Sequence, residues 1–421
     1  MDAAVSLPES ACSVGASGQV IAVDIATAKA VAAVHPVTET ERLPSLQALG
    51  RVLAADIVSP RALPPFDNSA MDGYAIRSAD LAGLGPWTLP VEGRVRAGDA
   101  PPIGAVGSAI RIFTGAPMPA GFDTVVMQER CQRDGDAVII SERPRPGQNV
   151  RPAGEDVHRG DVLVEAGAAL SSQKLALLAG VGIAEIEVFR KVRVAIISTG
   201  NELREPGDWL GPGQIYNSNR TMLLSSLASL VWVDVVDLGI VSDDHECLLT
   251  AIREAIACSD VLITTGGVSA GEEDHVAAVL SDSGAGFDVL KVAMRPGKPV
   301  KIGRAGRTLI AALPGNPNAA LVTFRQIALP AIRKAARLLH VYPDWQPARS
   351  AFSYKKPMGR TEFIPVRIQS LDSDGVPMLE MLGRGSSASL SALAGADGIA
   401  LLPPDTDGVE PGLALRFEFI G

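Results

Sequence analysis

Near its start the chain places apolar residues at helical spacing. The spacing covers residues 22–35 (AVDIATAKAVAAVH) and resumes at residues 43–53, before the turn-prone segment SPRALPPFDNS. From about residue 64 to residue 150 the pattern changes to short β-type runs, such as SAIRIF and DTVVMQ, separated by Gly, Pro and Asp. The pattern predicts two helices followed by a small β-rich domain.

Between residues 192 and 335 β-type and helical patterns alternate. Strands are predicted at VRVAIIS, VWVDVVDLG, DVLITT and FDVLKV, and helices are predicted to begin near Ser218, Asp243 and Asp274. Such alternation is typical of a mainly parallel sheet with helices on both faces.

The regions on either side of this alternation have patterns of their own. Residues 151–189 contain DVLVEAGAALS and a helical stretch, SSQKLALLAGVG, that closes on glycine. After a helix from about Asn318 into the 330s, strands at TEFIPVRI, PMLEML and LALRFEFI favour a β-barrel or sandwich. The predicted fold is a multidomain α/β plus β chain, with a discontinuous helical and extended linking domain at residues 21–54 and 151–188, a β-rich domain at 55–150, an α/β domain at 189–338 and a C-terminal β domain at 339–421.

Composition narrows the range of functions. The 421 residues exceed what one hydrophobic core usually supports, and a net charge of -9 argues against nonspecific binding of nucleic acid. The four cysteines form no CxxC pair, which disfavours a structural zinc site and a disulfide framework and favours the cytoplasm. Neither a signal peptide nor a membrane-spanning run of about 18 apolar residues is expected. The Walker motif GxxxxGK[ST] does not occur in the sequence.

Three polar loops follow predicted strands of the α/β domain. They are TGNEL (199–203), TGGVSAGEED (265–274) and PGNPNAA (314–320). Ligands of open α/β sheets bind outside the carboxyl ends of the strands, and glycine lets backbone N–H groups approach a phosphate closely. Each loop alone is equally consistent with a tight turn, but together the three loops predict a site for an anionic ligand.

The same loops carry an unexpected number of carboxylates. Glu202 and Asp274 belong to them, and Asp243 begins another predicted helix. Carboxylates beside a phosphate suit a bridging Mg²⁺ ion, although helix capping by Asp243 and Asp274 is the simpler alternative and is compatible with metal binding.

Cations and a second polar segment complete the candidate chemistry. Downstream, KVAMRPGKPVKIG supplies Lys291, Arg295 and Lys298 for charge neutralisation, whereas Lys301 is expected on a solvated strand face. The segment PPFDNSAMDGYAI (64–76) is equally consistent with a surface turn and with an active-site loop.

Eight segments occur in the order typical of the MoeA family of molybdopterin molybdenumtransferases, which this chain resembles over about residues 22–365. They are FDNSAMDGYA, TGAPMPAGFDTVV, VRPAGEDV, STGNEL, YNSN, TTGGVSAGEED, RPGKP and LPGNP. The resemblance implies an elongated homodimer of four-domain subunits, a linking domain that serves dimerisation, and a MogA-like molybdopterin-binding α/β domain. It also implies a Mg²⁺-assisted reaction in which adenylylated molybdopterin and molybdate give molybdenum bound to the pterin dithiolene, with release of AMP.

The site residues that the resemblance implies fall into two groups. The first has catalytic roles, with Glu202, Asp243 and Asp274 as ligands of Mg²⁺: Asp67, Asp156, Glu202, Asp243, Asp274, Lys291 and Arg295. The second binds substrate: Thr199, Gly200, Asn217, Ser218, Thr265, Gly266, Gly267, Ser269, Gly271, Lys298, Pro314, Gly315, Asn316, Pro317 and Arg360. Arg295 departs from the lysine of the bacterial pattern, and its planar fork differs from a compact ammonium group.

Two other activities compete with this reading. A MogA-like molybdopterin adenylyltransferase would be a much shorter chain, and a gephyrin-like scaffold would not need the carboxylate cluster. A tungstate-specific variant of the same enzyme also fits the sequence. A molybdopterin adenylyltransferase and molybdoenzyme maturation proteins are the expected working partners.

Overall fold

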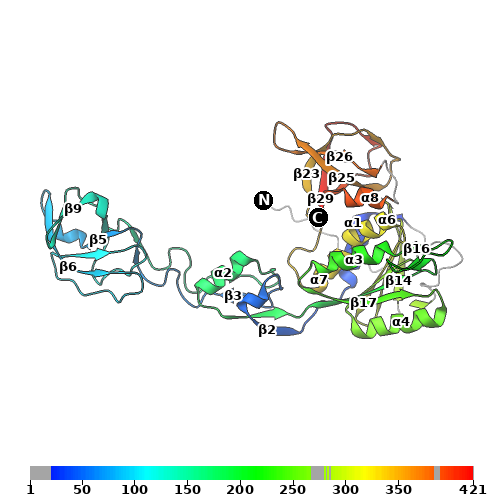
Figure 1. Ribbon diagram of the computed structural model, residues 1–421, viewed down its shortest axis with the longest axis horizontal. Coiled ribbons are helices and arrows are strands. Elements are labelled where there is room, and N and C mark those ends of the chain that lie inside the picture. Colours follow the sequence, from blue (N-terminus) through cyan, green and yellow to red (C-terminus); the bar gives the residue numbers. More distant parts are fainter. Residues whose placement is uncertain (1–19, 267–278, 281, 284–285, 384–388, 421) are drawn as a thin grey trace, which may run out of the picture.

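The computed structural model describes residues 20–266, 279–280, 282–283, 286–383 and 389–420. The chain is elongated (Figure 1): a β-rich domain lies at one end, a slender linking domain follows, and an α/β domain with a C-terminal barrel beside it occupies the other end.

The β-rich domain is built on a six-stranded sheet of order β8-β5-β7-β6-β10-β9. Both predicted runs are strands in it, as β7 (Ala109–Ile112) and β8 (Thr124–Met127). The other strands are β5 (Gly73–Ile76), β6 (Trp87–Val95), β9 (Cys131–Asp134) and β10 (Ala137–Ile140), with short 3-10 turns at Ser78–Asp80 and Gln128–Arg130. Apolar side chains on each side of this sheet form two small cores.

Two segments of the chain form the linking domain, one that precedes the β-rich domain in the sequence and one that follows it. Its outgoing strands β2 (Thr40–Pro44) and β3 (Ile57–Val58) pair antiparallel with the returning β13 (Glu185–Phe189) and β12 (Val162–Val164). Helix α2 (Ser172–Gly180) lies where it was predicted, and the Ser171 hydroxyl caps it by accepting from the Lys174 N–H at 3.3 Å. Strands β4 (Asn68–Ser69) and β11 (Val150–Arg151) make the same kind of pair at the exit to the β-rich domain.

The helix predicted over residues 43–53 is wrong. Thr40–Pro44 is a strand, Ser45–Ala48 is a single 3-10 turn, residues 49–50 form a further turn, and Val52 and Leu53 make isolated β-bridges. The backbone of β2 is hydrogen-bonded to β13, which lies far along the sequence, so local spacing does not reveal the partner that makes it a strand.

The α/β domain contains a seven-stranded sheet of order β1-β19-β21-β22-β18-β14-β17. The strands are β1 (Val20–Ile21), β14 (Val192–Thr199), β17 (Val233–Val241), β18 (Val261–Thr265), β19 (Gly286–Val292), β21 (Pro299–Ala305) and β22 (Thr308–Leu313). Within the sheet β21 runs against both of its neighbours, and the other pairings are parallel. The predicted mainly parallel sheet is confirmed.

Strand β21 corrects the expectation for Lys301. This side chain is only 3% exposed, although a solvated strand face was predicted. Because β21 lies inside the sheet and alternate residues face opposite sides, Val300 and Ile302 enter one core while Lys301 faces the other covered side.

Helices cover both faces of this sheet. One face carries α1 (Val23–Ala33), α3 (Ser218–Ala228), α6 (Pro317–Thr323) and α7 (Leu329–Ala335), the last two joined by a π-helical turn at Phe324–Ala328. The opposite face carries α4 (His245–Cys258). The packing of α1 places residues 23–33 with the α/β domain, whereas the sequence pattern groups residues 21–54 with the linking domain. The helix predicted to begin near Asp274 starts outside the described residues.

The C-terminal region is a closed barrel rather than a sandwich. Its strands are β23 (Gln346–Ser350), β25 (Thr361–Leu371), β26 (Pro377–Met381), β27 (Gly398–Leu402) and β29 (Ala414–Phe419), and pairing of β25 with both β26 and β27 closes the ring. A short β24 (Tyr354–Lys355) pairs with β28 (Gly408–Val409), and α8 spans Leu390–Ala394.

Strand β20 (Met294–Arg295) leaves the α/β domain and extends the barrel by pairing in parallel with the start of β25. In the part of the chain that the structure describes, no helix is both long and apolar enough to cross a membrane.

Candidate functional site

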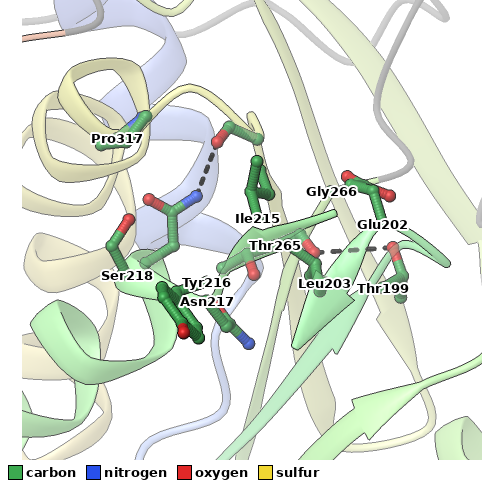
Figure 2. A pocket seen from close by; sticks show the side chains of 12 residues that line it. Thr199, Glu202, Leu203, Ile215, Tyr216, Asn217, Ser218, Thr265, Gly266 and Pro317 are labelled. Atoms are coloured by element: carbon green, nitrogen blue, oxygen red, sulfur yellow. Dashed lines mark hydrogen bonds between the residues drawn. The ribbon is translucent and has the colours of Figure 1, made fainter. Parts of the chain in front are cut away.

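A cleft opens at the carboxyl edge of β14 and β18, beside the first turns of α3 and α6 (Figure 2). Its lining combines three of the predicted loops with a short β15–β16 pair (Leu203–Arg204 and Ile215–Tyr216): Thr199, Glu202, Leu203, Ile215, Tyr216, Asn217, Ser218, Asn219, Thr265, Gly266, Gly315 and Pro317. Gly200, Pro314 and Asn316 lie in the same loops. The structure therefore brings together most of the predicted substrate-binding positions, while Gly267, Ser269 and Gly271 lie outside the described residues.

A glycine lets two of the loops approach one another closely. Gly266 has φ +93°, and a Cβ atom there would lie 2.3 Å from the carbonyl oxygen of Thr199. Gly200 has φ +143°, a conformation that L side chains rarely adopt, and it turns the chain beside the carboxylate of Glu202 in its own loop. Glycine therefore suits both positions, at Gly200 because of its backbone conformation and at Gly266 also because of the close backbone contact.

Capping asparagines begin both helices at the cleft. The Asn217 side chain accepts from the Arg220 N–H at 3.1 Å, and the Asn316 side chain accepts from the Ala319 N–H at 3.2 Å. Asn219 donates to the carbonyl of Gly315 at 2.7 Å, which ties α3 to the loop before α6. An eleven-residue helix such as α3 favours negative charge at its N-terminus.

Two buried amide atoms at this cleft have no hydrogen-bond partner among the described residues. They are Nδ2 of Asn217, a residue that is 2% exposed, and Oδ1 of Asn219, a residue that is 8% exposed. Buried polar atoms are nearly always satisfied, so this donor and this acceptor are available to an ordered water or to a polar ligand in the cleft. The sequence-based site omitted Asn219, although it stands in the same YNSN segment that pointed to Asn217 and Ser218.

The carboxylates Glu202 and Asp243 stand on neighbouring loops. Asp243 accepts from the N–H of Asn201 at 3.1 Å, and the Asn201 side-chain oxygen accepts from Ser242 at 3.2 Å. Glu202 is exposed at the cleft. The capping role predicted for Asp243 belongs instead to Asp244, whose carboxylate accepts from the N–H of Cys247 at 3.0 Å; this bond lowers the pKa of Asp244.

These carboxylates suit a hard cation. Carboxylate oxygens are the ligands that Mg²⁺ prefers, and two loops at one sheet edge present one each. Among the described residues no group of three His, Cys, Asp or Glu side chains is assembled, and the third predicted ligand, Asp274, lies outside them.

Two of the predicted cations meet between the α/β domain and the barrel. Arg295 lies 3.6 Å from a carboxylate oxygen of Glu362, and Arg360 donates to the other oxygen at 3.1 Å. The Tyr354 hydroxyl also donates to Glu362, at 3.0 Å, and burial raises the pKa of that phenol. Lys291, near the end of β19, and Lys298, just before β21, are both exposed. Sequence reasoning missed Tyr354 and Glu362, which lie in no glycine-rich or carboxylate-rich motif.

Asp67 and Asp156 lie together, but at the far side of the linking domain. Asp67 accepts from the N–H of Ala153 at 2.7 Å, and the N–H of Asp156 donates to the carbonyl of Leu63 at 3.0 Å. Both side chains are exposed, and Asp67 also lines a hollow of the β-rich domain beside Phe66 and Phe122. Residues 68–69 and 150–151 pair as β4 and β11 at the exit to the β-rich domain, and the linking domain separates the β-rich domain from the α/β domain (Figure 1).

Family models match three parts of the chain. Residues 21–182 match the MoeA N-terminal region (domain I and II), residues 195–334 match a probable molybdopterin binding domain, and residues 347–418 match the MoeA C-terminal region (domain IV).

Similar proteins cover nearly the whole chain. A molybdopterin molybdenumtransferase of Haemophilus influenzae is 38% identical, over 90% of this chain and 94% of that protein. Molybdopterin molybdenumtransferase 2 of Mycobacterium tuberculosis is 37% identical, over 92% of this chain and 96% of that protein. The crystal structure of a molybdopterin biosynthesis MoeA protein from Pyrococcus horikoshii superposes with a TM-score of 0.81 at 31% identity, covering 95% of this chain and 99% of that one. On these grounds the chain belongs to the MoeA family.

Proposed function

We propose that this protein is a transferase of molybdenum cofactor biosynthesis, which inserts molybdenum from molybdate into adenylylated molybdopterin and releases AMP. The observation that carries the proposal is the cleft of the α/β domain, where glycine turns, helix starts, unpaired buried amides and carboxylates converge. Its supports are membership of the MoeA family and the curated names of relatives that cover almost all of the chain.

The cleft is the proposed site of the pterin substrate. Backbone N–H groups of the loops at Gly200, Gly266 and Gly315, with the N-terminus of α3, would receive its phosphate groups. Asn217 and Asn219 leave one donor and one acceptor unpaired, which suits a heterocycle that carries both kinds of group. Gly267, Ser269 and Gly271 would extend this wall along the same loop.

Glu202 and Asp243, with Asp274 on the next loop, are the proposed ligands of Mg²⁺. The ion would offset the negative charge of the phosphoanhydride and of the departing AMP. Glu202 stands beside the turn at Gly200, and Asp243 is held in place by the N–H of Asn201.

The negative charge of molybdate would be balanced by four cationic side chains, those of Lys291, Arg295, Lys298 and Arg360. The two arginines offer forked donors suited to oxyanions. None of the cysteines in the described chain lines the cleft, which fits a substrate whose own dithiolene sulfurs hold the metal.

The homodimer is proposed to complete the site. Asp67 and Asp156 are neighbours, yet their own linking domain holds them away from the cleft. A two-fold partner placed alongside would bring its β-rich domain to the cleft, so these two aspartates would act from the second subunit of a cytoplasmic enzyme. A MogA-like adenylyltransferase is not favoured, because the family matches extend over the N-terminal and C-terminal domains.

A single-turnover assay tests this function. Purified protein is mixed with adenylylated molybdopterin, Mg²⁺ and molybdate, and AMP and active cofactor are measured. We expect molybdate-dependent AMP release in the wild-type protein. Glu202→Gln should lower the rate at least about tenfold, because a ligand charge is lost at the metal.

The matched control is Asp244→Asn, which keeps the cap of α4 while removing a charge from the adjoining loop. It should turn over at close to the wild-type rate. Absence of molybdate-dependent AMP release in the wild-type protein would contradict the proposed function, and equal losses in the two variants would contradict the role of Glu202.

A further inference from the structure

Glu362 is a buried carboxylate at the seam between the α/β domain and the barrel. Its side chain is 2% exposed, and it stands at the start of β25, directly opposite Arg295 in the pairing of β25 with β20. A carboxylate taken out of water is retained only where charged or hydrogen-bonding partners surround it.

Both of its oxygens are engaged. One accepts from Nε of Arg360 at 3.1 Å, and the other accepts from the Tyr354 hydroxyl at 3.0 Å and lies 3.6 Å from Arg295. Arg295 also donates to the Tyr354 oxygen at 3.3 Å. One carboxylate and one phenol thus hold two guanidinium groups, one contributed by each domain.

The arrangement leaves positive charge directed outward. The Arg295 side chain is 40% exposed and that of Arg360 is 37% exposed, so both guanidinium groups reach the surface while their anchor is buried. The buried amine of Lys356 lies close enough for Glu362 to raise its pKa, against the larger lowering caused by burial. The two arginines come from different domains and converge on one buried carboxylate, and their forked N–H groups suit an oxyanion.

We propose that Glu362 is a positioning residue, which fixes the guanidinium groups of Arg295 and Arg360 at the spacing that receives molybdate. The inference rests on the proposed function, because it takes molybdate as the anion that the two arginines bind. Glu362 itself does not touch the substrate. It acts by orienting the planar guanidinium groups of both arginines, which stand at the ends of long side chains.

The barrel offers a matched control for a purely structural role. Glu418 is also buried, at 4% exposure, and ties the barrel to the α/β domain by accepting from Arg325 at 2.6 Å and from Gln326 at 2.9 Å. Because it holds no candidate molybdate ligand, Glu418→Gln should weaken the domain seam without changing the affinity for molybdate.

The experiment measures molybdate binding to the full-length protein by calorimetry, together with steady-state kinetics. Glu362→Gln keeps the shape of the side chain but loses its charge. We expect its Kd and KM for molybdate to rise at least about tenfold, as for loss of an outer partner of a metal ligand. Its kcat at saturating molybdate should stay within about twofold of the wild-type value, since the reacting groups are unchanged.

Each result of these measurements either supports or contradicts the positioning role of Glu362. A wild-type molybdate Kd in Glu362→Gln, or equal shifts in Glu362→Gln and Glu418→Gln, would overturn the positioning role. If Glu362→Gln does not fold, Tyr354→Phe removes one of the bonds that hold Arg295, and an unchanged Kd in that variant overturns the inference as well. Failure of the wild-type protein to release AMP on addition of molybdate would instead count against the proposed function.

Discussion

At Gly266 the backbones of two loops of the cleft come into close contact. The residue takes φ +93°, and its Cα hydrogens face the carbonyl of Thr199, where a Cβ atom would lie at 2.3 Å. Thr199 and Thr265, each 2% exposed, close the floor beside it. A side chain at position 266 would therefore strain the backbone and also push apart the two loops that form the proposed phosphate site.

Gly266→Ala is expected to destabilise the α/β domain and to weaken binding of molybdopterin. The left-handed conformation alone costs an L-residue about 1–2 kcal/mol, and the clash with Thr199 adds to it. The measurements are the melting temperature and the molybdopterin Kd. Gly412→Ala is the control, because Gly412 has φ +88° with open space around it and lies in the barrel. Equal melting temperatures and unchanged Kd in the two variants would show that close approach at Gly266 is unimportant.

At the scale of elements, the wall of the cleft depends on how α3 is held. Arg220, in the first turn of α3, donates to both carboxylate oxygens of Asp237 on β17, at 2.7 and 2.5 Å, and to Glu205 beyond β15 at 2.6 Å. One guanidinium group thus ties the helix that carries Asn217 to the edge strand and to the loop beyond Glu202. The hydrogen bond from Arg220 is the largest cause of the lowered pKa of Asp237.

This pair predicts a dependence of stability on pH. The carboxyl of Asp237 has a lower pKa in the folded protein than the ordinary 3.8, so its stabilising effect is present above about pH 4 and is lost as the pH falls through the folded pKa. Asp237→Asn should therefore lower the melting temperature at pH 7, and the difference from wild type should shrink towards zero near pH 2. Scanning calorimetry over pH 2–8 measures it, with Asp234→Asn, an exposed position on β17, as control. A difference independent of pH would contradict the pair.

At the scale of the whole molecule, the elongated shape decides where the aspartates of the β-rich end can act. Strand β2 (40–44) pairs with β13 (185–189), and β3 (57–58) pairs with β12 (162–164). The outgoing and returning segments of the linking domain are thus hydrogen-bonded to each other, which makes the connection between the two ends a firm one. Asp67 directly precedes β4 and the N–H of Asp156 is hydrogen-bonded to Leu63, near the β4–β11 pair, and the linking domain separates the β-rich domain from the α/β domain (Figure 1). A site that needs them together with Glu202 is most simply built between two copies of the chain.

Subunit mixing tests this arrangement. Asp67→Asn and Glu202→Gln should each inactivate the homodimer. A purified heterodimer of the two variants carries one site with both substitutions and one intact site, so it should recover about half of the wild-type AMP release. Activity no higher than that of the two homodimers would place Asp67 and Glu202 of the same chain in one site.

Local sequence patterns predicted correctly the elements whose partners are near in the sequence. The α/β alternation, the β-rich domain and helix α2 follow from apolar spacing, glycine and capping residues that act within a few positions. The three loops of the cleft follow from the rule that the carboxyl ends of parallel strands meet at one edge. The helix prediction for residues 43–53 was wrong, because their apolar spacing is helical but the backbone at their start pairs with a strand that is distant in the sequence.

The sequence by itself determined the order of the elements and the candidate site loops, since glycine turns, asparagine caps and carboxylates are local features. Only the tertiary structure decided which of them meet. It buried Lys301 by placing β21 inside a sheet, and it set Arg295 and Arg360 on either side of Glu362 by pairing β20 with the barrel. It also held Asp67 and Asp156 away from the cleft of their own chain. Such contacts join residues from different domains, and their energies depend on burial and geometry that no local pattern contains.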